Sequence, residues 1–114
     1  MLVGAVDLPD GRVARWQEGR TTDALLSDDW EDVADVLAAL AHPVRLRLLR
    51  TLADGARTAR ELTELDGMGT SGQVYHHLRQ LVAAGWLSSR SGGRFEIPPE
   101  RVVPLLTTVL GGRR

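Results

Sequence analysis

Residues 70–81 read TSGQVYHHLRQL, and they predict an amphipathic helix with a defined start. Thr70 and Gln73 have the spacing of a capping box, in which the hydroxyl and the side-chain carbonyl each accept a hydrogen bond from a backbone N–H of the first turn. Gly85 lies where a helix end favours a residue that can adopt a left-handed conformation. We therefore expect a helix over residues 71–84.

The two faces of this predicted helix differ in chemistry. At about 100° per residue, Val74, Leu78 and Leu81 fall on one apolar stripe that must be buried. The opposite face carries small or hydrogen-bonding side chains and no acidic one: Gly72, Gln73, His76, Arg79 and Gln80. Such a face suits the major groove of DNA, where base edges offer donors and acceptors and phosphates attract cations. A merely solvated polar face would look the same in this helix alone.

The segments on either side of this helix add context. Thr58 and Glu61 form a second capping box, which predicts a short helix over residues 58–65, followed by the glycines of Gly67-Met68-Gly69. Residues 86–90 and 94–97 flank the glycine turn at 91–93 and predict a β-hairpin. Helix, turn, helix and hairpin in this order predict a winged helix-turn-helix.

Two further segments make a family resemblance specific. AHPVRLRLL at residues 41–49 resembles the opening of the winged helix-turn-helix domain in the arsenic-repressor-type (ArsR) family of transcriptional regulators, and HLRQLVAAGWL at residues 77–87 resembles its recognition-helix end. The resemblance covers residues 30–110. It implies a mainly α-helical domain with a small β-hairpin wing, which binds two-fold operator DNA as a homodimer and represses transcription. It also implies that the first and last helices form the dimer interface.

The resemblance implies how such regulators sense signals, and this chain departs from it. Many members bind metals through cysteines on the positioning helix, or through aspartate and histidine on the last helix. This chain contains no cysteine, and its last helix carries neither of the other ligands. We expect no metal site and no cofactor, so that any effector is an unidentified small molecule or protein.

The expected DNA contacts lie on the recognition helix and the wing. Gln73 and His76 occupy the first two turns, where a helix entering the groove places its base-reading side chains. Arg79, Arg90 and Arg94 are better placed for phosphates or the neighbouring minor groove. The full set of candidate DNA-binding residues is Thr70, Ser71, Gly72, Gln73, Tyr75, His76, Arg79, Arg90 and Arg94.

Three more helices are predicted from start signals and apolar spacing. They cover residues 28–41, 43–53 and 100–110, with Pro43 at the first turn of the second and Pro104 expected to kink the third or to delay its regular part. The last helix is too apolar for the surface of a small domain, so we expect a second copy to bury it. The candidate dimer-interface residues are Trp30, Val33, Leu37, Val102, Leu105, Leu106 and Val109.

The N-terminal residues lie outside the resemblance. The turn signal LPDGR at residues 8–12 separates two short apolar runs and predicts an N-terminal β-hairpin, with a frayed tail as the alternative. We expect Trp16 to pack against the domain or its dimer mate. The chain is accordingly divided into an extension at residues 1–22 and a DNA-binding and dimerisation domain at residues 23–114.

The charge of the chain is unevenly distributed. Residues 1–35 hold nine acidic side chains against three arginines, whereas residues 36–114 hold six against eleven. Because phosphate neutralisation dominates affinity for DNA, the basic part is the part expected to bind it. The chain has no apolar run near the ~18 residues of a membrane span, and we expect no membrane association and a cytoplasmic location.

Other functional classes are less well supported by the residues. His76 and His77 point about 100° apart on a helix and cannot chelate one metal, for which an i, i+4 spacing is preferred. We expect His77 to be half-buried and hydrogen-bonded to a neighbouring helix, and His42 to cap a helix. The sequence has no nucleophile elbow or phosphate-cradling loop, so we expect no enzyme. The alternative function is a winged helix used only for protein contacts, whose mark would be acidic or apolar residues on the outward face of the recognition helix.

Overall fold

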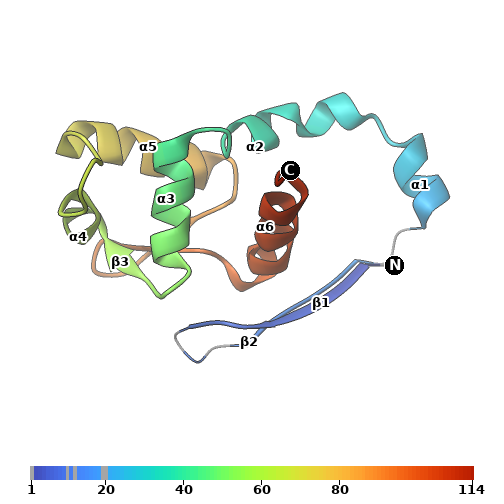
Figure 1. The fold of residues 1–114 in the computed structure, drawn as a ribbon, viewed down its shortest axis with the longest axis horizontal. Coiled ribbons are helices and arrows are strands. Elements are labelled where there is room, and N and C mark those ends of the chain that lie inside the picture. Colours follow the sequence, from blue (N-terminus) through green and yellow to red (C-terminus); the bar gives the residue numbers. More distant parts are fainter. Residues whose placement is uncertain (1, 10, 12, 19–20) are drawn as a thin grey trace.

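The computed structural model describes residues 2–9, 11, 13–18 and 21–114, with side chains for residues 7–9, 11, 13 and 21–114. The fold is mainly helical and carries a small antiparallel sheet, as a winged helix-turn-helix requires (Figure 1). The elements in chain order are β1 (Leu2–Asp7), β2 (Val13–Glu18), α1 (Thr22–Ser27), the 3-10 helix η1 (Trp30–Val33), α2 (Ala34–Ala38), α3 (Pro43–Leu52), β3 (Arg57–Thr58), α4 (Ala59–Thr63), α5 (Ser71–Ala83), β4 (Ser88–Arg90), β5 (Arg94–Glu96) and α6 (Pro99–Gly111).

The helix-turn-helix consists of α4 and α5, and both predicted capping boxes are present. Thr58 caps α4 with Glu61, and Thr70 caps α5 with Gln73. Gly85 has a φ of 83°, which only glycine adopts without strain, and the following Trp86 N–H donates to the Leu81 carbonyl at 2.9 Å to close the end of α5. The predicted ranges are confirmed to within two residues.

The wing is the β4–β5 hairpin that the glycine turn predicted. Its register pairs Ser88 with Glu96 and Arg90 with Arg94. A third strand, β3, pairs with β5 and was not predicted, because two residues are too few to show a strand period. Since β3 leads directly into α4, this pairing attaches the wing to the start of the helix-turn-helix.

One hydrophobic core lies beneath α3, α4 and α5. Its completely buried side chains come from all three helices, and Trp86, Leu87 and Ile97 extend the core to the wing. Removing one such leucine typically costs about 2–5 kcal/mol. The completely buried residues are Leu48, Leu52, Leu62, Val74, Leu78 and Leu81.

The prediction of one α-helix over residues 28–41 is confirmed only for its central part, residues 30–38. The segment divides into η1 and α2, and a separate helix, α1, precedes them. Thr21 caps α1 with its hydroxyl, which accepts from the Ala24 N–H at 3.1 Å, and the extended conformation of Asp28 ends that helix. Residues 21–35 are all exposed, so no packing extends these short helices into one. We call residues 22–38 the arm.

The predicted N-terminal hairpin is present. Strands β1 and β2 pair antiparallel from Leu2 opposite Glu18 to Asp7 opposite Val13, and Leu8 at the turn is buried in the core. The hairpin lies alongside α6, so that α6 runs between the hairpin and the arm (Figure 1). The side chain of Trp16 lies outside the described part of the chain, and its packing stays a prediction.

The last helix begins one residue before its predicted start and continues past Pro104 without interruption. The Thr108 hydroxyl donates to the Pro104 carbonyl at 2.8 Å. Within the described residues, no helix is both long and apolar enough to cross a membrane.

Candidate nucleic-acid interface

Helix α5 separates the two faces that its sequence predicted. Val74, Leu78 and Leu81 have no solvent exposure, and they fix the helix against the core. The predicted contact residues on α5 and at its cap are all exposed: Thr70, Ser71, Gly72, Gln73, Tyr75, His76 and Arg79. The structure therefore brings these seven residues onto one accessible surface.

The start of α5 engages one of the predicted base-reading side chains. The Gln73 carbonyl oxygen Oε1 accepts a hydrogen bond from the Thr70 N–H at 2.8 Å. Gly69, with a φ of 85°, leaves room for this amide, because a Cβ at that position would collide with Gln73 Oε1. The amide nitrogen of Gln73 stays available, so the residue can reach DNA mainly as a hydrogen-bond donor.

Gly72 and Tyr75 also lie on this surface. A Cβ at Gly72 would approach no closer than 3.9 Å to the Thr70 hydroxyl, so internal packing does not require glycine there. Tyr75 is 46% exposed, and its ring lies outside the core. Both positions are open for a close approach of DNA.

The wing arginines differ in their surroundings. The Arg90 guanidinium forms an ion pair with Glu96 at 2.6 Å, which partly neutralises it. Arg94 is exposed on the neighbouring strand and lies near the start of α4. Hydrogen bonds from the Thr58 backbone and hydroxyl lower the pKa of the Glu61 carboxyl, and the charges of Arg57 and Arg94 lower it further. Arg94 and Arg57 thus place positive charge beside the helix-turn-helix.

The rings of the three histidines of the chain lie near one another, with His42 just before α3 and His76 and His77 on α5. His77 is half-buried, and its Nδ1 accepts from Arg45 Nε on α3 at 3.0 Å. His42 caps α3 through its Nδ1, which accepts from the Val44 N–H at 3.2 Å. Both predictions are confirmed. The ring centroids of His42 and His77 lie 4.5 Å apart, and those of His76 and His77 lie 5.6 Å apart.

Burial lowers the pKa of His77, and the neighbouring His42, Arg45 and His76 lower it further. The neutral imidazole is the form that can accept the Arg45 hydrogen bond. In the described part of the chain, no three His, Cys, Asp or Glu side chains are grouped so as to hold a metal ion.

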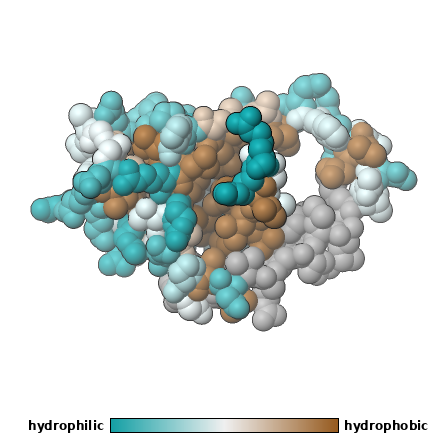
Figure 2. Space-filling view, viewed as in Figure 1, coloured by the Kyte–Doolittle hydropathy of each residue, from teal (hydrophilic) through white to brown (hydrophobic). Residues whose placement is uncertain are grey.

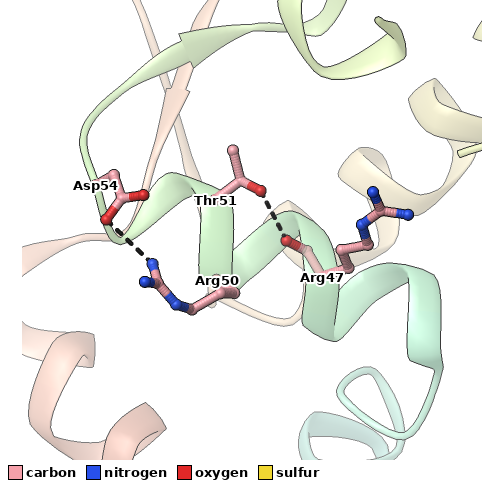
Figure 3. Close-up of polar contacts among 4 residues, drawn as sticks. All are labelled: Arg47, Arg50, Thr51 and Asp54. Atoms are coloured by element: carbon pink, nitrogen blue, oxygen red, sulfur yellow. Dashed lines mark hydrogen bonds and ion pairs between the residues drawn. The ribbon is translucent and has the colours of Figure 1, made fainter. Parts of the chain in front are cut away.

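Helix α3 supplies contacts that sequence reasoning missed. The Arg47 guanidinium donates to the Asp66 carbonyl in the turn between α4 and α5, and so ties the turn to α3. Arg50 instead pairs with Asp54 at 3.0 Å, and the Thr51 hydroxyl donates to the Arg47 carbonyl at 3.0 Å (Figure 3). The partners of Arg45 and Arg47 are distant in sequence, which is why spacing along α3 gave no signal for them.

The predicted dimer-interface residues fall into two groups. Val102 and Leu105 are only 4% and 5% exposed, so they belong to the core of the monomer and not to a free stripe. The sequence pattern of α6 could not separate its core face from its exposed face, because apolar residues occupy both. The remaining five are exposed: Trp30, Val33, Leu37, Leu106 and Val109.

Exposed apolar surface is concentrated on the arm and on α6. A groove of about 600 Å³ in the arm is lined by Leu25, Trp30, Val33 and Leu37, with carboxylates that include Asp29 and Asp32. A smaller apolar notch of about 150 Å³ lies between α3 and α6. Figure 2 shows hydrophobic surface where α6 lies in Figure 1, and a separate hydrophobic patch on the arm.

Comparisons with known proteins agree with this fold. A family model described as a helix-turn-helix domain matches residues 40–88. The chain is 35% identical over 79 residues to the "Probable mercury resistance operon repressor" of Streptomyces lividans, a match that covers 67% of this chain and 62% of that protein. The chain thus spans less than two thirds of this relative.

Two solved structures from Mycobacterium bovis are similar along most or all of their length. A crystal structure of a "possible transcriptional regulatory protein", fragment 1–100, is 30% identical with a TM-score of 0.61, and the match covers 82% of this chain and all of that one. A solution structure described as the homodimeric winged helix-turn-helix DNA-binding domain of Mb0332, "a possible ArsR-family transcriptional regulator", is 29% identical with a TM-score of 0.61, over 83% of this chain and 88% of that one. The capped recognition helix, the wing and these matches together show that the chain belongs to the ArsR-type winged helix-turn-helix family of transcriptional regulators.

Proposed function

We propose that this protein is a sequence-specific DNA-binding transcriptional repressor that binds two-fold operator DNA as a homodimer. The observation that carries the proposal is the division of α5 into a completely buried face, with Val74, Leu78 and Leu81, and an exposed face that holds hydrogen-bonding side chains and no acid. A helix fixed in this way presents a rigid polar surface of the width that a major groove accepts.

The charge distribution supports DNA as the partner. Residues 70–85 contain Arg79 and no acidic side chain, and Arg57 and Arg94 add positive charge from the sheet. Contacts from these arginines to phosphates would release counterions and provide affinity that does not depend on sequence. The side chains at the start of α5 would then select the sequence.

A second copy of the chain would complete the molecule. The exposed end of α6 carries Leu106, Val109 and Leu110, followed by Arg113 and Arg114. The arm is also apolar but carries the opposite charge, since its groove has carboxylates at Asp29 and Asp32. The arm of one copy therefore fits the end of α6 of the other in both hydrophobicity and charge. Two recognition helices about 34 Å apart would meet successive major grooves.

The proposal is tested by selecting bound duplexes from a pool of random sequence and titrating the binding with salt. We expect a two-fold consensus, and an affinity whose logarithm falls linearly with log salt by about 0.9 for each phosphate contacted. Absent or salt-insensitive binding would overturn the proposal and favour a winged helix that contacts only proteins.

A further inference from the structure

Two side chains from the body of the protein, those of Trp86 and Arg45, hold the end of α2, where the arm joins the body. The Trp86 indole Nε1 donates to the Val36 carbonyl at 2.8 Å, and Arg45 Nη1 donates to the Ala39 carbonyl at 3.3 Å. Residues 21–35 are exposed throughout, and burial begins only with the partly buried Val36 and the buried Ala39 and Leu40. Whatever holds this end of α2 therefore sets where the arm lies relative to the body.

One of these two attachments also contacts the recognition helix. While Nη1 of Arg45 donates to the carbonyl of Ala39, the residue directly after the arm, Nε of the same guanidinium donates to His77 Nδ1 on α5 at 3.0 Å. A guanidinium is planar and rigid, so its two bonds cannot be adjusted independently. Arg45 thus fixes the distance between the end of the arm and the inner side of the recognition helix.

The bond to His77 requires a neutral imidazole. Protonation places a hydrogen on Nδ1, so Nδ1 has no lone pair left to accept the hydrogen bond from Arg45. Protonation also adds a second positive charge beside the guanidinium. The charged and titratable groups around this contact are His42 on the loop before α3, Arg45 on α3, His76 on α5, and Asp35 on α2. Asp35 lines the same groove of about 450 Å³ between α2 and α5 as Arg45 does.

We propose that Arg45 is a positioning residue that couples the arm to the recognition helix, and that protonation of His77 releases the coupling. The inference rests on the proposed function, because it assigns this contact a role in aligning α5 with the operator. In the coupled state the neutral imidazole holds α5 in register with the arm. In acid, Arg45 keeps only the Ala39 carbonyl, and this link between α5 and the end of the arm is lost.

The sign of the pH effect follows from the lowered pKa of His77. A histidine in the unfolded chain has a pKa near 6.5, whereas in the folded chain burial, and then the neighbouring His42, Arg45 and His76, lower the pKa of His77. Breaking the Arg45 bond removes part of this lowering. The state without the Arg45–His77 bond therefore binds more protons. The coupling is intact above about pH 6.5 and weakens as the pH falls below that value.

The first test needs no DNA. NMR spectra of the free protein are recorded from about pH 8 to about pH 5, the range over which histidines titrate. We expect the backbone amides of Ala39 and its neighbours to shift with the same midpoint as the His77 ring. In Arg45→Gln the His77 midpoint should rise, and the Ala39 amide should no longer follow it. Arg50→Gln is the matched control, since Arg50 lies on the same helix but pairs with Asp54, and it should behave like the wild type.

The second test compares the selected duplex with random duplex at each pH. An added positive charge would strengthen both complexes, whereas misalignment of α5 weakens only the specific one. We expect the ratio of the two affinities to fall about tenfold on acidification, equivalent to about 1.4 kcal/mol. Arg45→Gln should give a low ratio at every pH. His77→Asn should keep a high ratio in acid, because its amide oxygen can accept from Arg45 without titrating.

The outcomes separate this inference from the proposed function. The coupling would be overturned if the Ala39 amide did not shift as His77 titrates. It would also be overturned if the pH dependence persisted in His77→Asn, because that dependence would then belong to His76 or His42. Linked titration in a protein that binds no DNA would instead leave the coupling standing and refute the proposed function.

Discussion

The recognition helix and the arm both carry apolar residues at helical spacing, but they use them in opposite ways. Val74, Leu78 and Leu81 of α5 are completely buried, whereas Leu26 and Trp30 of the arm are 62% and 61% exposed. The apolar residues of α5 therefore specify the fold of the monomer. Those of the arm contribute to stability only when another surface covers them, which makes the arm the part of the molecule that depends on assembly.

Leucine truncations should separate the two regions most strongly. We expect Leu78→Ala to lower the free energy of unfolding by about 2–5 kcal/mol, because it leaves a cavity in the core. Leu26→Ala in the arm should change it by less than about 0.5 kcal/mol. Urea unfolding at protein concentrations low enough to keep the chain monomeric measures both. Similar losses in the two variants would mean that the arm is packed within one chain.

The exposed end of α6 should matter for assembly and not for folding. Leu106→Asp with Val109→Asp places two charges on the proposed interface, and we expect a folded monomer in sedimentation experiments. Affinity for a two-fold site should fall about 100-fold or more, because the second half-site contact is lost. Thr107→Asp, which is also exposed on α6, is the control that should stay dimeric. A double variant that remains a dimer would place the interface elsewhere.

This division also explains which parts of the fold were predictable from the sequence. Helices α3 and α5 were predicted because their signals are local: a proline or a capping box at the start, and an apolar stripe that the core then buries. In the arm the same kind of stripe has no core to meet, so the Thr21 cap and the break at Asp28 decide the helix ends. Periodicity alone predicted one α-helix where the structure has η1 followed directly by α2, and it missed α1.

The candidate site was predictable to a similar extent. Exposure of Gln73, His76 and Arg79 follows from helical geometry once the buried face is known. The Arg45–His77 contact joins residues 32 positions apart and two different helices, so no local pattern could reveal it. The ion pair of Arg90 with Glu96 likewise depends on how the two strands of the wing pack, and sequence reasoning treated Arg90 as equivalent to Arg94.

The N-terminal hairpin should stabilise the body through α6. Deletion of residues 1–17 removes the buried Leu8 and the strands that lie alongside α6, and full burial of a leucine is worth about 1.5–3 kcal/mol. We therefore expect a lower melting temperature in calorimetry. Leu8→Ala in the full-length chain is the milder companion variant and should shift it in the same direction. An unchanged melting temperature for the deletion would show that the hairpin does not support the fold.

Gln73 should combine base reading with capping. Gln73→Ala removes a hydrogen-bond donor at the groove and is expected to cost about 1–3 kcal/mol at the selected site and little on random DNA. It also removes the acceptor for the Thr70 N–H, so unfolding of the free protein must be measured alongside. Gln73→Glu keeps that acceptor and is the control for capping. Equal losses on selected and random DNA would remove Gln73 from sequence recognition.

The smallest effects are expected on the wing, where they distinguish two arginines of the same hairpin. Arg94 lies beside the helix-turn-helix, whereas the charge of Arg90 is partly neutralised by Glu96 at 2.6 Å. Arg94→Ala should weaken binding to selected and random DNA alike and reduce the salt slope by about one unit. Arg90→Ala should reduce the slope by less, because breaking its ion pair on binding offsets part of the gain from a phosphate contact. Salt titrations of both variants on both duplexes provide the comparison. If Arg94→Ala alters which sequence is preferred, the wing takes part in reading the operator, and its assignment to phosphate contacts fails.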